Sequence, residues 1–412
     1  MRIYRARIVL PVTAPPIEDG AIVVDGAQIV AVGRFAEVKA AHAGEVVDLG
    51  EQILMPGLVN AHCHLDYSMM RWAIHPQRSF TEWIIRINAL KRSLSDLDYL
   101  HAIARGFAEL RKWGTTTVAN IESFPELLLH MAPPPIRTWW FFEMIDIRHR
   151  ETTEETVAGA LAFFTQRPGW LGGFGLSPHA PYTASGALYA LAADTAEKLG
   201  MPITTHVAES REEADMFRLG RGELYDFMLK LGRWMYDCHE RRTPFAHLAA
   251  TTPLGRRWLL AHMNEVEDSD FALLASMPAG ARPSVVHCPG SHRYFQHRPF
   301  PLERLMALGI NICLGTDSLA STESLSLFEE MRGLARQAPS LDAAAITRIA
   351  THHGALALGI PAGEIAAGKL ADLIALPFTG PAEGSYARVL EQRDAVAWMM
   401  VNGQILSASE LH

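Results

Sequence analysis

A chain of 412 residues that is 49% hydrophobic and 20% charged can bury a large core, and it exceeds the length that one core usually serves. The 37 lysines and arginines against 45 aspartates and glutamates give a formal charge of -8 at pH 7, and no basic run interleaved with aromatics is present. This balance argues against nucleic acid as a partner. The four cysteines are scattered without a C-x-x-C pair, which argues against a disulfide framework and a zinc ribbon and indicates a cytoplasmic protein.

No uncharged apolar run reaches about 18 residues, so we expect no membrane span. The apolar part of the N-terminal sequence MRIYRARIVLPV is too short for a signal peptide. The sequence leaves open whether the chain forms a homo-oligomer.

Both ends of the chain are rich in short β-forming runs. RIYRARIVLPV and GAIVVDGAQIVAVG stand near the N-terminus, and GKLADLIALP and AVAWMMVNGQIL stand near the C-terminus. Turn residues separate these runs in the pattern of short antiparallel strands. Because neither end is large enough to form its own core, we predict one small β-sandwich domain built from residues 1–55 together with residues 366–412.

Between these ends, residues 56–365 alternate β-rich runs with helical periodicity. Eight strands are predicted, at 53–62, 115–122, 138–145, 172–180, 202–210, 258–263, 284–289 and 310–318. Most neighbouring strands are separated by a helix-like segment. This alternation predicts an α/β fold, a (β/α)8 TIM-like barrel that carries the small β-sandwich domain.

Helix signals support the barrel. Apolar residues recur at helical spacing from Phe80 to Leu94, and a second helix is predicted to begin at the capping box that starts at Ser95 and to end at Gly114. A long segment, residues 211–257, is rich in Arg, Trp and Tyr and is expected to form a helical insertion or a lid over the barrel mouth.

Barrel enzymes build their sites at the C-terminal ends of the strands, so the residues at those ends are the candidates. They are, in strand order, His62 and His64, Glu122, Glu143, His179, His206 and Glu209, His262, His287, and Asp317. Any one of them alone is as well explained by a satisfied polar group at a strand end. Their joint placement is what indicates a site.

His62 and His64 are two residues apart, so on a strand their side chains point to the same face. His206 adds a third imidazole and Asp317 an anionic oxygen, each from another strand that ends at the same side of the barrel. Three nitrogens and one carboxylate suit Zn²⁺ or Fe²⁺, with a water completing the shell. The sequence therefore predicts a catalytic divalent metal, with zinc favoured, held by these four side chains.

Several motifs carry a resemblance to a known family: PGLVNAHCHLDYS, TTHVAES, VVHCPGS, LGTDS and GEIAAGKLADLIAL. They resemble the amidohydrolase superfamily, and within it the branch of metal-dependent deaminases and chlorohydrolases that includes aminodeoxyfutalosine, S-adenosylhomocysteine and adenosine deaminases. The resemblance covers nearly the whole chain. It implies the same four metal ligands, with Glu209 and His262 as the proton-handling pair and His179 as a substrate contact.

The expected reaction is hydrolysis at a C=N carbon of a heteroaromatic ring. A divalent metal lowers the pKa of its bound water toward neutrality, and Asp317 can take the proton. Glu209 can protonate the ring nitrogen, and His262 can orient the water or stabilise the developing alkoxide. Asp317 then passes its proton to the departing ammonia, which leaves a carbonyl in place of an amino group.

Departures from the family pattern bear on the subclass. The fourth strand, LGGFGLSPHA, has no lysine of the kind that bridges two metals in the hydantoinase type, which favours one metal per chain. The family's usual HCPxSN reads HCPGSH here, so His292 adds a polar group near the substrate side. Glu143 is a further candidate substrate contact, or else a partner for Arg148.

The favoured substrate is a 6-aminopurine nucleoside with an altered 5′ group, such as aminodeoxyfutalosine or an adenosine derivative. S-adenosylhomocysteine deaminases usually carry a ribose-binding glutamate after an F-x-x-W sequence, but the stretch here, FTEWIIRINALKRS, is rich in Arg and Lys. Arg86 and Arg92 in this stretch could meet a substrate carboxylate, although a solvated helix face is the simpler explanation. The alternatives are a triazine chlorohydrolase or aminohydrolase and a guanine or cytosine deaminase. A non-catalytic scaffold is least favoured, because the full ligand set is present.

Overall fold

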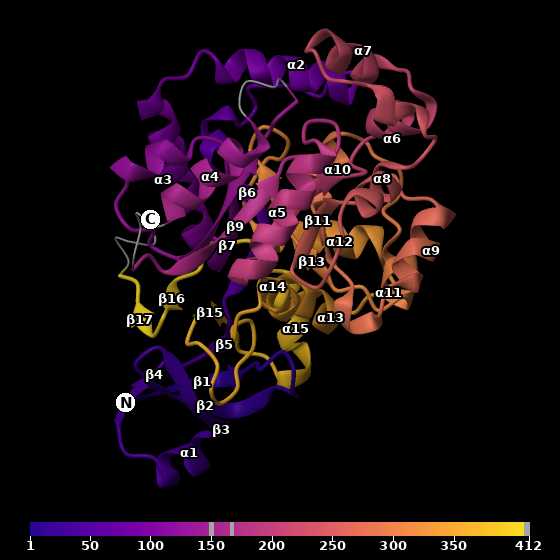
Figure 1. The fold of residues 1–412 in the computed structure, drawn as a ribbon. Helices are drawn as coiled ribbons and strands as arrows, with labels where there is room; N and C mark the ends of the chain where they lie inside the picture. Colours follow the sequence, from indigo (N-terminus) through magenta and orange to yellow (C-terminus); the bar gives the residue numbers. More distant parts are fainter. Residues whose placement is uncertain (148–151, 165–168, 408–412) are drawn as a thin grey trace.

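The computed structural model describes residues 1–147, 152–164 and 169–407. Its strands form two sheets, one of nine strands and one of eight. Figure 1 shows helices packed around the nine-stranded sheet, with the eight-stranded sheet at the end of the molecule that carries the N-terminus. None of the helices within these ranges is long and apolar enough to cross a membrane.

The nine-stranded sheet is a closed parallel barrel, as predicted. Its order is β13-β12-β11-β10-β9-β8-β7-β6-β14, and every described pairing in it is parallel. The strands are β6 (Leu58–His64), β7 (Thr115–Glu122), β8 (Arg137–Met144), β9 (Gly172–Pro178), β10 (Ile203–Val207), β11 (Trp258–His262), β12 (Ser284–His287), β13 (Ile312–Leu314) and β14 (Asp317–Ser318). The predicted eighth strand is broken in two: β13 pairs with β12, while β14 pairs with β6 and closes the barrel.

Helices surround the barrel, apart from α1 (Phe35–Ala41), which packs on the eight-stranded sheet (Figure 1). The other helices outside the predicted insertion are α2 (Phe80–Lys91), α3 (Asp96–Lys112), α4 (Thr153–Phe164), α5 (Gly186–Leu199), α9 (Asp268–Ser276), α10 (Pro289–Tyr294), α11 (Leu302–Ala307), α12 (Leu327–Gln337), α13 (Ala343–Arg348), α14 (Gly354–Leu358) and α15 (Ser385–Leu390). The short helical turns are η1 (Leu65–Met70), η2 (Pro125–His130), η4 (Ala279–Ala281), η5 (Ile349–His353) and η6 (Ala382–Gly384). The predicted capping box of α3 is present, with Ser95 and Asp98 bonding each other's backbone amides.

The predicted insertion, residues 211–257, is helical, and its helices lie in two different places. It contains α6 (Arg211–Leu219), α7 (Glu223–Lys230), η3 (Tyr236–His239) and α8 (Pro244–Thr251). The helix α8 packs beside α5 and α9 and therefore belongs to the outer ring of the barrel. The helix α7 contacts α2 instead, and Figure 1 shows both at the end of the molecule opposite the N-terminus. Only the first part of the segment therefore lies over the barrel mouth.

The smaller sheet joins the two ends of the chain. Its strands are β1 (Arg2–Val9), β2 (Ile17–Asp25), β3 (Gln28–Arg34), β4 (Glu45–Asp48), β5 (Gln52–Pro56), β15 (Leu373–Pro377), β16 (Trp398–Val401) and β17 (Gln404–Ile405). The strands β5 and β15, far apart in sequence, pair antiparallel. The predicted antiparallel pattern is confirmed for most pairings of this sheet, but β1 pairs parallel with both β4 and β5. The exact domain boundaries stay a prediction.

Candidate metal centre

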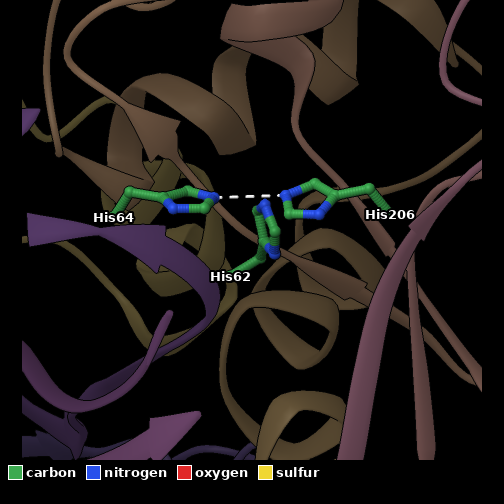
Figure 2. Close-up of side chains that lie close together, drawn as sticks. All are labelled: His62, His64 and His206. Carbon is green, nitrogen blue, oxygen red and sulfur yellow. Dashed lines mark hydrogen bonds between the residues drawn. The ribbon is translucent and has the colours of Figure 1, made fainter. Parts of the chain in front are cut away.

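Three imidazoles meet at the C-terminal end of the barrel. His62 and His64 come from the last residues of β6, and His206 comes from β10. All three are at most 5% exposed, and Figure 2 shows their rings pointing toward a common centre. The Nε2 atoms of His64 and His206 lie 3.2 Å apart. The spacing of two residues on β6 therefore places both of its histidines on the barrel interior, as predicted.

Asp317 completes the group from β14, the second half of the broken strand. Its Oδ1 lies 3.8 Å from Nε2 of His62 and 3.9 Å from Nε2 of His64. Its Oδ2 accepts hydrogen bonds from the hydroxyls of Ser291 (2.6 Å) and Ser321 (2.9 Å). The hydroxyls occupy one carboxylate oxygen and leave the other facing the histidines.

These four side chains fit a divalent metal. In a tetrahedral site with bonds of about 2.0–2.2 Å, ligand atoms stand roughly 3.3–3.6 Å apart, which is close to the spacing found here. The buried Nε2 of His62 has no hydrogen-bond partner among the described residues, so a bound cation would satisfy it. The Nδ1 of His206 donates to the carbonyl of His179 (2.8 Å), which leaves the Nε2 lone pair facing the centre.

The electrostatics of the site agree with this assignment. Burial lowers the pKa of His62 well below its usual value and that of His64 to about 4, so both rings are neutral, as metal ligands must be. Burial would raise the pKa of Asp317, but the imidazoles of His262 and His64 outweigh burial and keep it lowered. The group therefore offers neutral nitrogens from His62 and His64 and an anionic oxygen from Asp317.

Glu209 and His262 stand together beside this group. The Oε1 of Glu209 lies 3.7 Å from the Nε2 of His262, and single ligand atoms of Glu209, His262 and Asp317 all lie within 4.8 Å of one another. Burial, and then the nearby Asp317, raise the pKa of Glu209 well above its ordinary value. A carboxyl group that keeps its proton in this position can act as a general acid toward a molecule in the cavity.

Two turns with unusual backbone geometry present this pair. His262 has a φ of 76°, and the amide of Met263 bonds back to the carbonyl of Ala261 (3.2 Å), which closes a tight three-residue turn. Ala208, just before Glu209, has a φ of 52°. Such conformations are costly for residues with a Cβ and persist only where the surroundings impose them.

Glu213 fixes the second turn. Its Oε2 accepts a hydrogen bond from the backbone amide of Glu209 (2.7 Å), and its own amide donates to the hydroxyl of Ser210, the N-cap of α6. On the other side, the side-chain amide of Asn264 donates to the carbonyl of Glu209 (3.0 Å). Glu209 therefore stands on a backbone that is held from both sides.

A cavity of about 460 Å³ opens above the group, within the range of small-molecule sites. Its walls come from the ends of the barrel strands and the segments that follow them, and its roof comes from one face each of α2 and α7. It is lined by His64, Tyr67, Phe80, Trp83, Ile84, Ile87, Asn88, Lys91, Glu143, Ile145, Asp146, Ile147, His179, Tyr182, Thr183, His206, Glu209, Phe227, Met228, Leu231, His262, Asp317 and Ser318.

Of the three predicted substrate contacts, two line the cavity and one does not. His179 and Glu143 both line the cavity, with Nε2 of His179 3.9 Å from Oε1 of Glu143. Arg148, the alternative partner for Glu143, lies outside the described residues. His292 is not among the lining residues, and its ring nitrogens contact the carbonyl of Arg298 (2.7 Å) and the side chain of Gln337 (3.4 Å). Its predicted role toward the substrate draws no support from this placement.

Sequence reasoning missed several side chains that shape the site. Tyr67 stacks on the ring of His64, with centroids 5.5 Å apart, and the ammonium of Lys91 lies over the ring of Tyr67. Ser291 and Ser321 hold Asp317. Ser291 stands inside the quoted VVHCPGS motif, which was a usable signal. The signal for Lys91 was weaker, because only its helical spacing from Trp83 and Ile87 pointed to it.

The chain resembles known proteins along most of its length. Residues 53–406 match the model of the amidohydrolase family. The chain is 30% identical over 356 residues to aminodeoxyfutalosine deaminase of Deinococcus radiodurans. This match covers 82% of the present chain and 81% of the relative. It is 28% identical over 380 residues to 5-methylthioadenosine/S-adenosylhomocysteine deaminase of Pyrococcus furiosus, with 89% and 82% covered.

A comparison with solved structures gives the same result. An adenosine deaminase of Xanthomonas campestris with bound zinc superposes with a TM-score of 0.83 at 25% identity, covering 98% of this chain and 92% of that one. The barrel and the convergent His, Asp and Glu side chains define a metal-dependent hydrolase. The chain belongs to the amidohydrolase family, and it is a hydrolase that acts on C–N bonds.

Proposed function

We propose that this protein is a zinc-dependent hydrolytic deaminase of a 6-aminopurine nucleoside. One observation carries the proposal: Glu209 and His262 stand beside a group of three histidines and an aspartate, inside one cavity of nucleoside size. The names of the two relatives, both deaminases of adenosine-type compounds, support the choice of substrate.

His62, His64, His206 and Asp317 would hold the metal. When bound, a divalent ion of this kind makes water acidic enough to attack at neutral pH. Strand β9 and the residues that follow it to Ala180 contain no lysine that could bridge a second ion, which supports one metal per chain.

The side chains then divide the proton transfers. Asp317 accepts a proton from the attacking water, whose oxygen bonds to the ring carbon that carries the amino group. Glu209 donates a proton to the adjacent ring nitrogen as negative charge develops there. His262 bonds the added oxygen, and Asp317 returns its proton to the amino nitrogen as the C–N bond breaks. The proton that remains on the added oxygen passes to Glu209, which restores its carboxyl group and forms the C=O bond. Ammonia leaves, and the ring keeps a carbonyl.

His179 and Glu143 would orient the substrate. Burial lowers the pKa of His179 to about 3, so its ring is neutral at pH 7. Burial would raise the pKa of Glu143, but His179 and then Lys91 outweigh burial and lower it to about 2. A neutral ring and a carboxylate side by side offer hydrogen bonds to the amino groups or hydroxyls of a nucleoside.

Ammonia release by the metal-loaded protein tests the proposal. The panel comprises aminodeoxyfutalosine, S-adenosylhomocysteine, methylthioadenosine, 5′-deoxyadenosine, adenosine, guanine, cytosine and aminotriazines, with chloride release measured on chlorotriazines. We expect turnover of an aminopurine nucleoside and a loss of at least about 100-fold in kcat in Glu209→Gln, because the ring nitrogen loses its proton donor. Release from a triazine, or from guanine or cytosine alone, would contradict the assigned substrate class.

A further inference from the structure

One face of α2 lines the cavity, and its polarity changes along the helix. Six of its residues line the cavity at helical spacing: Phe80, Trp83, Ile84, Ile87, Asn88 and Lys91. The face is apolar at the N-terminal end of the helix and polar at the C-terminal end. A ligand lying along this face would therefore meet an apolar surface at one end and an ammonium group at the other.

Aromatic side chains contact the ammonium group of Lys91. Its ammonium donates to the Tyr67 hydroxyl and lies 4.8 Å from the centroid of the Tyr67 ring and 5.5 Å from that of Phe124. Within the described part of the chain it forms no ion pair with a carboxylate, whereas Arg86 on the same helix pairs with Glu82. The charge of Lys91 acts to lower the pKa of both Asp66 and Glu143, but no ion pair joins it to either carboxyl group, so the half-buried ammonium can accept a carboxylate from a ligand.

The remaining charges of the cavity direct an anion to this corner. Glu143, Glu209 and Asp317 line the cavity with carboxyl groups, and Lys91 is the one lysine or arginine among the described lining residues. An acidic group placed at the metal centre would face the carboxylate of Asp317 at low dielectric, whereas at Lys91 it would meet the positive side chain of the described lining. Tyr67, which stacks on His64, connects the ammonium to the metal centre, so both ends of one small molecule could reach them.

We propose that Lys91 forms an anion-binding subsite and that the substrate is an aminopurine nucleoside carrying a carboxylate. The inference rests on the proposed function and deepens it. A carboxylate fits better than a phosphate, because a single ammonium neutralises one negative charge and phosphate sites gather several cations or amide donors. The apolar end of the α2 face would pack against the rest of the acidic substituent.

Matched substrates test the subsite. The kinetics of aminodeoxyfutalosine, which carries a carboxylate, are compared with those of its neutral methyl ester, in the wild-type protein, Lys91→Met, Lys91→Gln and the control Arg92→Met. Arg92 is the adjacent cation, exposed and outside the cavity lining. We expect kcat/KM for the acid to fall about 10- to 100-fold in both Lys91 variants, and that for the ester to change less than about threefold. Arg92→Met should leave both unchanged.

Equal losses on acid and ester, or equal losses in Arg92→Met, would overturn the subsite and leave the deaminase intact. Metal content and thermal unfolding are measured on each variant, and the second substitution at Lys91 guards against one that fails to fold.

A second arm does not depend on turnover. Calorimetry compares the binding of benzoate with that of benzamide to the same metal-loaded proteins. We expect benzoate to bind the wild-type and Arg92→Met proteins at least about tenfold more tightly than either Lys91 variant. The affinity for benzamide should be the same in all four proteins. Benzoate binding that is absent, or unaffected at Lys91, would overturn the subsite. Lys91-dependent binding without turnover of any nucleoside would instead count against the proposed function alone.

Discussion

Asp317 faces the proposed metal with only one of its oxygens. The other oxygen is occupied by the hydroxyls of Ser291 and Ser321, which hold the carboxylate in one orientation. Groups that orient a metal ligand in this way typically contribute 10- to 100-fold to metal affinity. The orientation of Asp317 is therefore as much a property of these serines as of its own backbone.

Removing one of these hydroxyls should weaken metal binding. We expect Ser291→Ala to lower zinc affinity about 10- to 100-fold, measured by competition with a chromogenic chelator. Ser340→Ala, which removes a hydroxyl from an exposed residue bonded to Glu303, serves as the control and should change nothing. An unchanged affinity in Ser291→Ala would show that Asp317 is positioned without this bond, or that it does not bind the metal.

The sequence predicts site residues that stand at the ends of strands. It does not predict site residues whose place depends on how distant segments pack together. His62, His64, His206 and Asp317 follow β-rich runs, so the barrel topology alone brings them together. Lys91 lies on a helix whose pattern is dominated by apolar positions, and its position at the cavity depends on how α2 crosses the barrel mouth. His292 shows the converse, since a motif position suggested a substrate contact and the ring is used in local hydrogen bonds.

The break between β13 and β14 is the element that delivers Asp317. Gly315 lies in this break, and a Cβ at that position would stand 2.7 Å from the Cβ of His62 and 2.8 Å from its carbonyl oxygen. The amide of Thr316 bonds that same carbonyl (3.0 Å). The chain can approach His62 this closely only because Gly315 has no side chain.

Filling this space should damage both stability and the metal centre. We expect Gly315→Ala to destabilise the protein by about 1–3 kcal/mol in denaturant unfolding and to lower the bound metal, because His62 must move. Gly255→Ala is the matched control, since its Cβ would meet no atom within 4 Å. Equal stability of the two variants would contradict the close approach.

The element pattern could be predicted in part. Six of the eight strand runs and the capping box of α3 follow from local spacing, and the structure confirms them. The first predicted run, 53–62, is divided between β5 of the smaller sheet and β6 of the barrel, and the last, 310–318, between β13 and β14. The division of the last strand and the use of α8 in the outer ring depend on which neighbours each segment finds, and no local pattern encodes that choice. The same holds for the parallel pairing of β1 with β4 and β5.

At the scale of the whole molecule, a buried ion pair joins the two sheets. Arg137, at the start of β8, donates to Asp372, just before β15, at 2.7 Å, and the side chains are 8% and 1% exposed. Asp372 also accepts from the amide of Asn402 (2.6 Å). The pair lies at the N-terminal end of a barrel strand, away from the metal centre, where such interactions serve stability. The fold therefore separates the part that joins the chain ends from the part that carries the chemistry.

The metal content of the purified protein tests the central claim most directly. Elemental analysis of the wild-type protein should find about one zinc per chain, and His206→Ala should retain less than a tenth of it while keeping its circular dichroism spectrum, because one of four ligands is gone. Two ions per chain would contradict the mononuclear site. No metal in the wild-type protein after zinc loading, or an undiminished content in His206→Ala, would contradict the assignment of His62, His64, His206 and Asp317 as its ligands.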